Sequence, residues 1–158
     1  MPAMPVLAIL LSVLGLVPFI VCGLAALGPN PVTAARMLTT LIDYGALVLA
    51  FSAGIHWGFE LQSPQENRGV GRARLGIAVA ALTVGWIATV LPMVTAAWLS
   101  LVVLIAGYIG AVLVEQEAAK RGLMPPHYLW LRWGFTVIAV AMLVTVLTLR
   151  LLGQTIVF

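Results

Sequence analysis

Residues 75–114, LGIAVAALTVGWIATVLPMVTAAWLSLVVLIAGYIGAVLV, contain no charged residue in 40 consecutive positions. A single helix of that length would extend about 60 Å at 1.5 Å per residue, roughly twice the hydrocarbon thickness of a bilayer. Two membrane-crossing helices joined by a tight turn fit the stretch better. Pro92 lies near the midpoint, so we expect the turn at residues 92–96.

The composition places the whole chain in a membrane. Of its 158 residues, 63% are hydrophobic and 8% are charged, with a mean hydropathy of +1.14, whereas a soluble domain carries roughly 25% charged residues. The apolar runs are continuous and about 20 residues long, which is typical of spanning helices and not of barrel strands. We therefore predict an all-α polytopic membrane helix bundle, with residues 1–158 forming one integral membrane domain. The five predicted spans are residues 5–27, 36–61, 74–92, 95–114 and 129–152.

Basic residues are distributed unevenly between the two sides of this predicted bundle. Five spans place the N-terminus and the polar segments 62–74 and 115–128, which we interpret as exposed loops, on one side. Six of the eight basic residues gather there, if Arg132 extends to the nearer membrane surface. The positive-inside rule then predicts a cytoplasmic N-terminus and a periplasmic C-terminus. The net charge of +3 is too small and too scattered for nucleic-acid binding.

The second span carries a pair of glycines at the spacing that favours close helix packing. Gly54 and Gly58 are four residues apart, and small residues at this spacing let two helix backbones approach in lipid. On the helical wheel the same face leads back to Asp43, which Tyr44 follows. We expect this face to be packed and Asp43 to lie near the outer end of the span, either paired with Arg36 or a partner on another helix or forming one station of a proton or ion path.

A polar stripe lies on the other side of this predicted helix. Ser52, His56 and Glu60 follow one another at intervals of four residues. One interpretation is that the helix simply meets the water here, with Trp57 in the interfacial aromatic belt. The other is a shallow pocket facing the cytoplasm, formed by His56, Trp57, Glu60 and His127, that binds a quinone or a lipid headgroup.

Other classes of chemistry find little support in the sequence. Cys22 is the only cysteine, which excludes an internal disulfide and a cysteine-based metal site. Two histidines 71 residues apart have no metal-ligand spacing, so no metal is predicted, and haem ligation would require a loop to fold over the pocket. No phosphate-binding loop or hydrolase motif is present. We therefore expect a protein that is not an enzyme and has no obligatory cofactor.

Three stretches resemble a family of small membrane proteins of unknown function, which includes the mitochondrial transmembrane protein 69 proteins and proteobacterial relatives. They are DYGALVLAFSAGIHWG at residues 43–58, LGLVPF at 14–19 and PHYLWLR at 126–132. Ala50 stands where the resemblance leads us to expect serine. The family resemblance implies a bacterial inner membrane, or alternatively a mitochondrial inner membrane, and it draws attention to His56 and Trp57. It implies no activity.

These observations favour a non-enzymatic accessory or assembly partner of a larger membrane complex, for example a respiratory one. Its expected partners are the lipid bilayer and either another membrane protein or further copies of the chain. A protein that binds quinone or lipid near His56 is the first alternative. A minimal transporter is the second, and it would need an oligomer to supply a polar path, because the third and fourth spans carry no charge.

Overall fold

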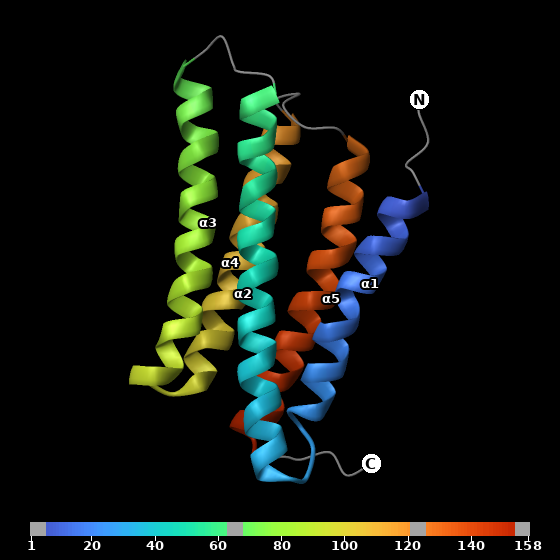
Figure 1. Ribbon diagram of the computed structural model, residues 1–158, viewed down its shortest axis with the longest axis vertical. Helices are drawn as coiled ribbons and strands as arrows, with labels where there is room; N and C mark the ends of the chain where they lie inside the picture. Colours follow the sequence, from blue (N-terminus) through green and yellow to red (C-terminus); the bar gives the residue numbers. More distant parts are fainter. Residues whose placement is uncertain (1–5, 63–67, 121–125, 154–158) are drawn as a thin grey trace. The chain divides into compact units, whose positions relative to one another are not determined.

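Five α-helices form the part of the chain that the structure describes, which comprises residues 6–62, 68–120 and 126–153 of a computed structural model (Figure 1). No strand occurs in these ranges, so the predicted all-α fold class is confirmed. The helices, in chain order, are α1 (Val6–Ala25), α2 (Pro31–Gln62), α3 (Arg68–Val94), α4 (Ala97–Lys120) and α5 (Pro126–Leu151).

Within the described ranges, four helices are long and apolar enough to cross a membrane. Their candidate spans are Pro31–Gly58, Gly71–Val94, Ala97–Lys120 and Tyr128–Leu151. The apolar part of α1, Ile9–Ala25, is shorter. At about 25 Å it lies near the lower limit for a spanning helix. The chain is thus a membrane helix bundle with four long apolar helices and one shorter one.

The turn inside the charge-free stretch lies where the sequence predicts it. The helix α3 ends at Val94 and α4 begins at Ala97. The backbone N–H of Thr95 donates to the carbonyl of Leu91 at 2.8 Å, which closes the final turn of α3. Each of the two helices is long and apolar enough to cross a membrane once. The prediction of two spans in this stretch is therefore confirmed.

The start of α2 differs from the prediction and changes the place of Asp43 along the helix. The Oδ1 atom of Asn30 accepts hydrogen bonds from the backbone N–H groups of Val32 at 3.0 Å and Thr33 at 3.1 Å. Asn30 is therefore the N-cap, and Pro31 occupies the first helical position, which its fixed φ favours. Because α2 begins at Pro31, five residues before the predicted start of the span, Asp43 lies about 18 Å into the helix, and its predicted position near the outer end of the membrane span stays a prediction.

The polar segments are more helical than predicted. Arg68–Val94 is one helix, so Arg74 belongs to α3 and not to a loop, and Glu115 belongs to α4. Helical turns are tolerated there because the charges find partners on neighbouring turns or helices. Lys120 and Glu117, for example, pair at 3.7 Å across one turn of α4.

The chain divides into two compact units. Met1–Leu41 and Tyr108–Phe158 form the first unit, and Ile42–Gly107 forms the second. The first contains α1 and α5, whereas the second contains α3 and most of α2. The helices α2 and α4 each contribute residues to both units.

In the first unit, α1 packs along α5 (Figure 1). The fully buried ring of Phe19 makes edge-to-face contacts with Phe135 at 5.9 Å and Tyr108 at 6.0 Å between ring centroids. One turn further along α1, a Cβ at Gly23 would collide with the side chain of Met142. A larger residue at this position would require the flexible side chain of Met142 to move, so glycine favours the close packing of α1 on α5.

In the second unit, α2 and α3 approach closely at one glycine. A Cβ built on Gly85 of α3 would lie 3.0 Å from the carbonyl oxygen of Ala46 in α2. Small residues allow such contacts between membrane helices, where packing and not hydrophobicity drives association. The close contact predicted at a glycine of α2 is thus made by a glycine of α3.

Candidate functional site

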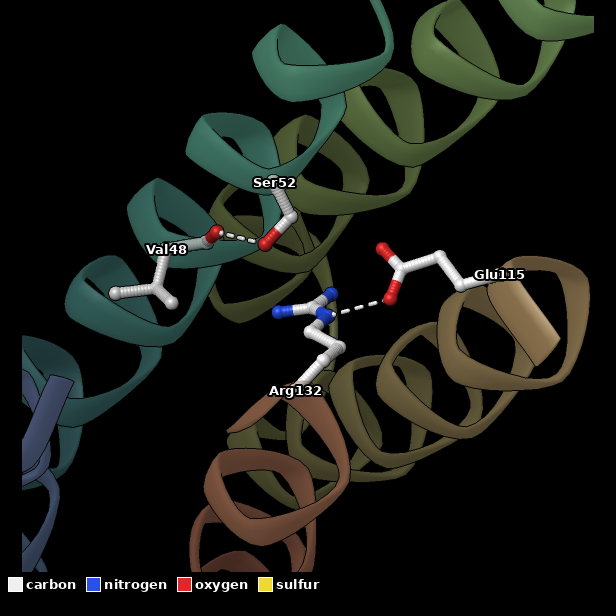
Figure 2. A network of polar contacts seen from close by, with 4 residues as sticks. All are labelled: Val48, Ser52, Glu115 and Arg132. Carbon is white, nitrogen blue, oxygen red and sulfur yellow. Dashed lines mark hydrogen bonds and ion pairs between the residues drawn. The ribbon is translucent and has the colours of Figure 1, made fainter. Parts of the chain in front are cut away.

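The predicted polar stripe of α2 faces the inside of the protein. Ser52 is 4% exposed and His56 is 5% exposed, while Glu60 is partly buried. The hydroxyl of Ser52 donates to the carbonyl of Val48 at 2.8 Å, one turn earlier in the same helix (Figure 2). The three side chains share one helix face, as their spacing predicts. His56 is therefore a buried histidine, and its level relative to the membrane surface stays a prediction.

The other residues predicted to join this site lie elsewhere or outside the description. Trp57 is 48% exposed and points away from the buried stripe, because the next residue in a helix is turned by 100°. His127 belongs to the first turn of α5, and its side chain lies outside the described part of the structure. The combination of His56, Trp57, Glu60 and His127 in one ligand pocket therefore stays a prediction.

Glu60 forms an ion pair that joins α2 to α3. Its Oε2 atom lies 3.6 Å from Nη1 of Arg74, and both side chains are largely buried, at 15% and 9% exposure. Gly71, one turn before Arg74, leaves room for the carboxylate, because a Cβ at this position would collide with Oε1 of Glu60. The pair connects the end of one helix to the start of the next.

A second and more deeply buried ion pair joins α4 to α5. The Nε atom of Arg132 donates to Oε2 of Glu115 at 2.9 Å, and the two side chains are 7% and 1% exposed (Figure 2). The sequence did not predict this pair. The sequence places Glu115 in a polar segment that reads as a loop, and it suggests that the side chain of Arg132 extends toward the membrane surface. A glutamate near the end of one apolar helix and an arginine near the start of the next is the signal that would have found it.

Arg132 has hydrogen-bonding capacity beyond this pair. Its Nη2 atom is buried and makes no hydrogen bond with any group in the described ranges, and the same holds for the hydroxyl of Thr136 one turn further along α5. Buried polar groups in native proteins nearly always find a partner. These two donors are available to a small polar acceptor at this level of the helix.

The glycine face of α2 points outward. Gly54 and Gly58 are exposed, and a Cβ on either would meet no atom within 4 Å in the part of the chain that the structure describes. The packing expected for this face within the bundle is therefore not found. The reason is that α2 turns its opposite face inward, with Leu49, Ala53 and the polar stripe buried.

Asp43 lies at the edge of this outward face, beside a groove between α2 and α3. The groove has a volume of about 350 Å³, and Asp43 and Trp86 are among the residues that line it. Asp43 is exposed and has no hydrogen bond or ion pair with any residue that the structure describes. The neighbouring Tyr44 is partly buried.

Among the described residues, no three histidine, cysteine or acidic side chains are grouped closely enough to hold a metal ion. The ionisable residues form pairs instead. The polar chemistry available consists of two Glu–Arg pairs, one buried histidine and one outward-facing carboxylate.

Comparison with known proteins identifies the family. Residues 4–148 match the family described as "Protein of unknown function (DUF3429)", which is more than nine-tenths of the chain. The chain belongs to this family. No curated protein and no solved structure matches the chain. The family match agrees with the predicted membership of an uncharacterised family, and it assigns no activity to any residue.

Proposed function

We propose that this DUF3429 protein is a non-enzymatic membrane protein that assembles with another membrane-spanning helix through the outer face of α2. This α2 outer face consists of Leu47, Phe51, Gly54 and Gly58. Leu47 is 67% exposed and Phe51 is 74% exposed. The single observation that carries the proposal is the pair of outward-facing glycines, at which an added Cβ would meet no atom within 4 Å among the residues that the structure describes.

Exposed leucine and phenylalanine would suit lipid without any partner, but the two glycines would not. Each glycine in a helix interior costs about 1 kcal/mol relative to alanine, and it offers lipid no side chain to contact. Close approach of a second helix recovers packing at such positions. A Gly–x–x–x–Gly pair between Phe51 and the end of the span therefore favours a helix docked from outside the chain.

Affinity purification of the tagged full chain from native membranes in mild detergent tests this proposal. We expect a stoichiometric protein partner, or a second copy of the chain, in the eluate. Replacing Gly54 and Gly58 together by leucine should lower the recovered partner by about tenfold, equivalent to about 1.4 kcal/mol of association free energy, because the side chains hold the helices apart.

Gly110→Leu provides a matched control for this experiment. Gly110 is also an exposed helical glycine at which an added Cβ would meet no atom within 4 Å in the described chain, but it lies on α4. The control variant should retain the partner. Equal recovery from the wild type and the Gly54/Gly58 double variant would contradict the proposed interface.

The same preparation separates the rival hypotheses. A quinone or lipid that co-purifies and is lost in His56→Ala would favour a ligand protein, for which the burial of His56 is the supporting observation. The more specific relationship to mitochondrial transmembrane protein 69 proteins stays a prediction from the three matching stretches. A transporter has the weakest support, because the described parts of α3 beyond Arg74 and of α4 before Glu115 carry no charged side chain.

We further infer that the N-terminus is cytoplasmic and the C-terminus periplasmic in a bacterial inner membrane. The basis is the excess of basic residues in and beside the α2–α3 and α4–α5 connections, where six of the eight lie: Arg68, Arg72, Arg74, Lys120, Arg121 and Arg132. A C-terminal alkaline phosphatase fusion should be active, and a C-terminal green fluorescent fusion should be dark. Bright cytoplasmic fluorescence from the C-terminal fusion would reverse the assignment.

A further inference from the structure

The groove between α2 and α3 lies wholly within the second unit of the chain. Ala46 and Gly85 approach each other closely where they line it. Leucine and alanine side chains line the groove, with Leu47 on α2 and Leu82 on α3 both exposed. Its volume of about 350 Å³ is within the range of small-molecule sites, which are typically mostly apolar with a few polar groups.

The lining of this apolar groove includes one charged side chain, that of Asp43. Asp43 is the only ionisable side chain in its lining, and it has no ion pair or hydrogen bond in the described chain. It lies about 18 Å from the start of α2 and about 22 Å from Gly58, close to the middle of the candidate span Pro31–Gly58. Carboxylates at such depths are costly, and they normally face a counter-charge.

An aromatic ring complements the carboxylate. Trp86 on α3 lines the same groove and is 63% exposed. The face of a tryptophan ring attracts organic cations, and quaternary ammonium groups are commonly recognised by aromatic faces. A carboxylate, an exposed indole and aliphatic walls together match a molecule with one positive charge and an apolar body.

A metal ion does not match this lining. Calcium and magnesium take six or more oxygen ligands, and zinc takes about four nitrogen, sulfur or oxygen ligands. The groove offers a single carboxylate and, on Thr89, one hydroxyl that already donates to the carbonyl of Trp86 at 2.8 Å. The remaining lining is apolar and supplies no ligand atoms for a metal ion.

We propose that the α2–α3 groove binds a hydrophobic organic cation, with Asp43 supplying the counter-charge and Trp86 the aromatic contact. This inference goes beyond the proposed assembly role and does not depend on it. The groove and the glycine pair lie on the same side of α2 but at different levels of the helix, because the α2 residues that line the groove end at Ala50 and the glycines are at positions 54 and 58. A chain without its protein partner can therefore be tested for the cation.

Tetraphenylphosphonium is a suitable probe, and equilibrium dialysis with the purified full chain in detergent measures its binding. We expect saturable binding that weakens by about tenfold or more in Asp43→Asn, because the charge pair is lost. Trp86→Leu should weaken it by about two- to fivefold, the size of an exposed cation–π contact. Ala50→Trp, which fills the groove and leaves the carboxylate in place, should also reduce binding.

Two controls make the test decisive. Tetraphenylborate has nearly the same shape and the opposite charge, so it should not show Asp43-dependent binding. Glu117→Gln removes an exposed acid on α4 and should leave phosphonium binding unchanged. Helicity and elution volume identical to wild type would show that each variant is folded. Equal phosphonium affinity in wild type and Asp43→Asn, or no saturable binding at all, would overturn the proposal.

Discussion

Replacing Arg132 by methionine should destabilise the protein strongly, because it removes one partner of a buried ion pair. The substitution leaves the carboxylate of Glu115, whose side chain is 1% exposed, without the guanidinium that donates to it at 2.9 Å. Breaking one side of a buried ion pair typically costs about 3–5 kcal/mol. We expect a loss of this size in reversible unfolding of the purified chain in mixed micelles, followed by circular dichroism.

The double variant Arg132→Met with Glu115→Met distinguishes the effect of an unpaired buried charge from other effects of changing these two side chains. Two apolar side chains of similar length leave no uncompensated charge, so the double variant should be closer to wild type than Arg132→Met alone. Arg150→Met is the control on the same helix, since Arg150 is exposed and its Nε atom makes a long contact of 3.3 Å with the carbonyl of Ala26. A double variant as unstable as the worse single one would show that the pair is not the cause.

The number and order of the helices could be predicted because the governing feature is simple. Forty residues without charge cannot form one span, and Pro92 marks where they divide. Composition alone sets the class of protein, because 8% charged residues cannot cover a soluble surface. These inferences need only the length of a helix and the thickness of a bilayer, so no knowledge of tertiary contacts enters them.

The helix boundaries could not be predicted in the same way, because they depend on partners. Glu115 and Arg74 look like loop residues in isolation, and they become helical because each finds an opposite charge on the adjoining helix. The start of α2 escapes prediction for a local reason. Asn30 followed by Pro31 has the composition of a turn, although the same pair is a good N-cap and first helical residue.

The sequence predicts correctly which residues of α2 share a face, but not which of its faces is buried in the protein. The spacing of Ser52, His56 and Glu60 puts them on one face, opposite Gly54, and the structure has both arrangements. A glycine pair indicates close helix contact, but it does not say whether the second helix belongs to the same chain. Similarly, Trp86 gains a place beside Asp43 only once α2 and α3 are packed.

Replacing Gly85 by valine should also destabilise the protein, because it acts on a close backbone contact between α2 and α3. A Cβ at this position already lies 3.0 Å from the backbone oxygen of Ala46, and a backbone atom cannot rotate out of the way. The two methyl groups of valine would push the helices apart. Overpacking of this kind typically costs about 1–3 kcal/mol, and we expect that loss in the same micelle unfolding experiment.

Gly76→Val is the matched control, since it introduces the same side chain into the same helix. Gly76 is exposed, and a Cβ there meets no atom within 4 Å in the described chain, so only the modest helix propensity of valine is tested. Gly85→Val should also widen the groove beside Asp43, and phosphonium binding should weaken with it, whereas Gly76→Val should leave binding unchanged. If both variants unfold alike, the contact between Gly85 and Ala46 does not hold α2 against α3.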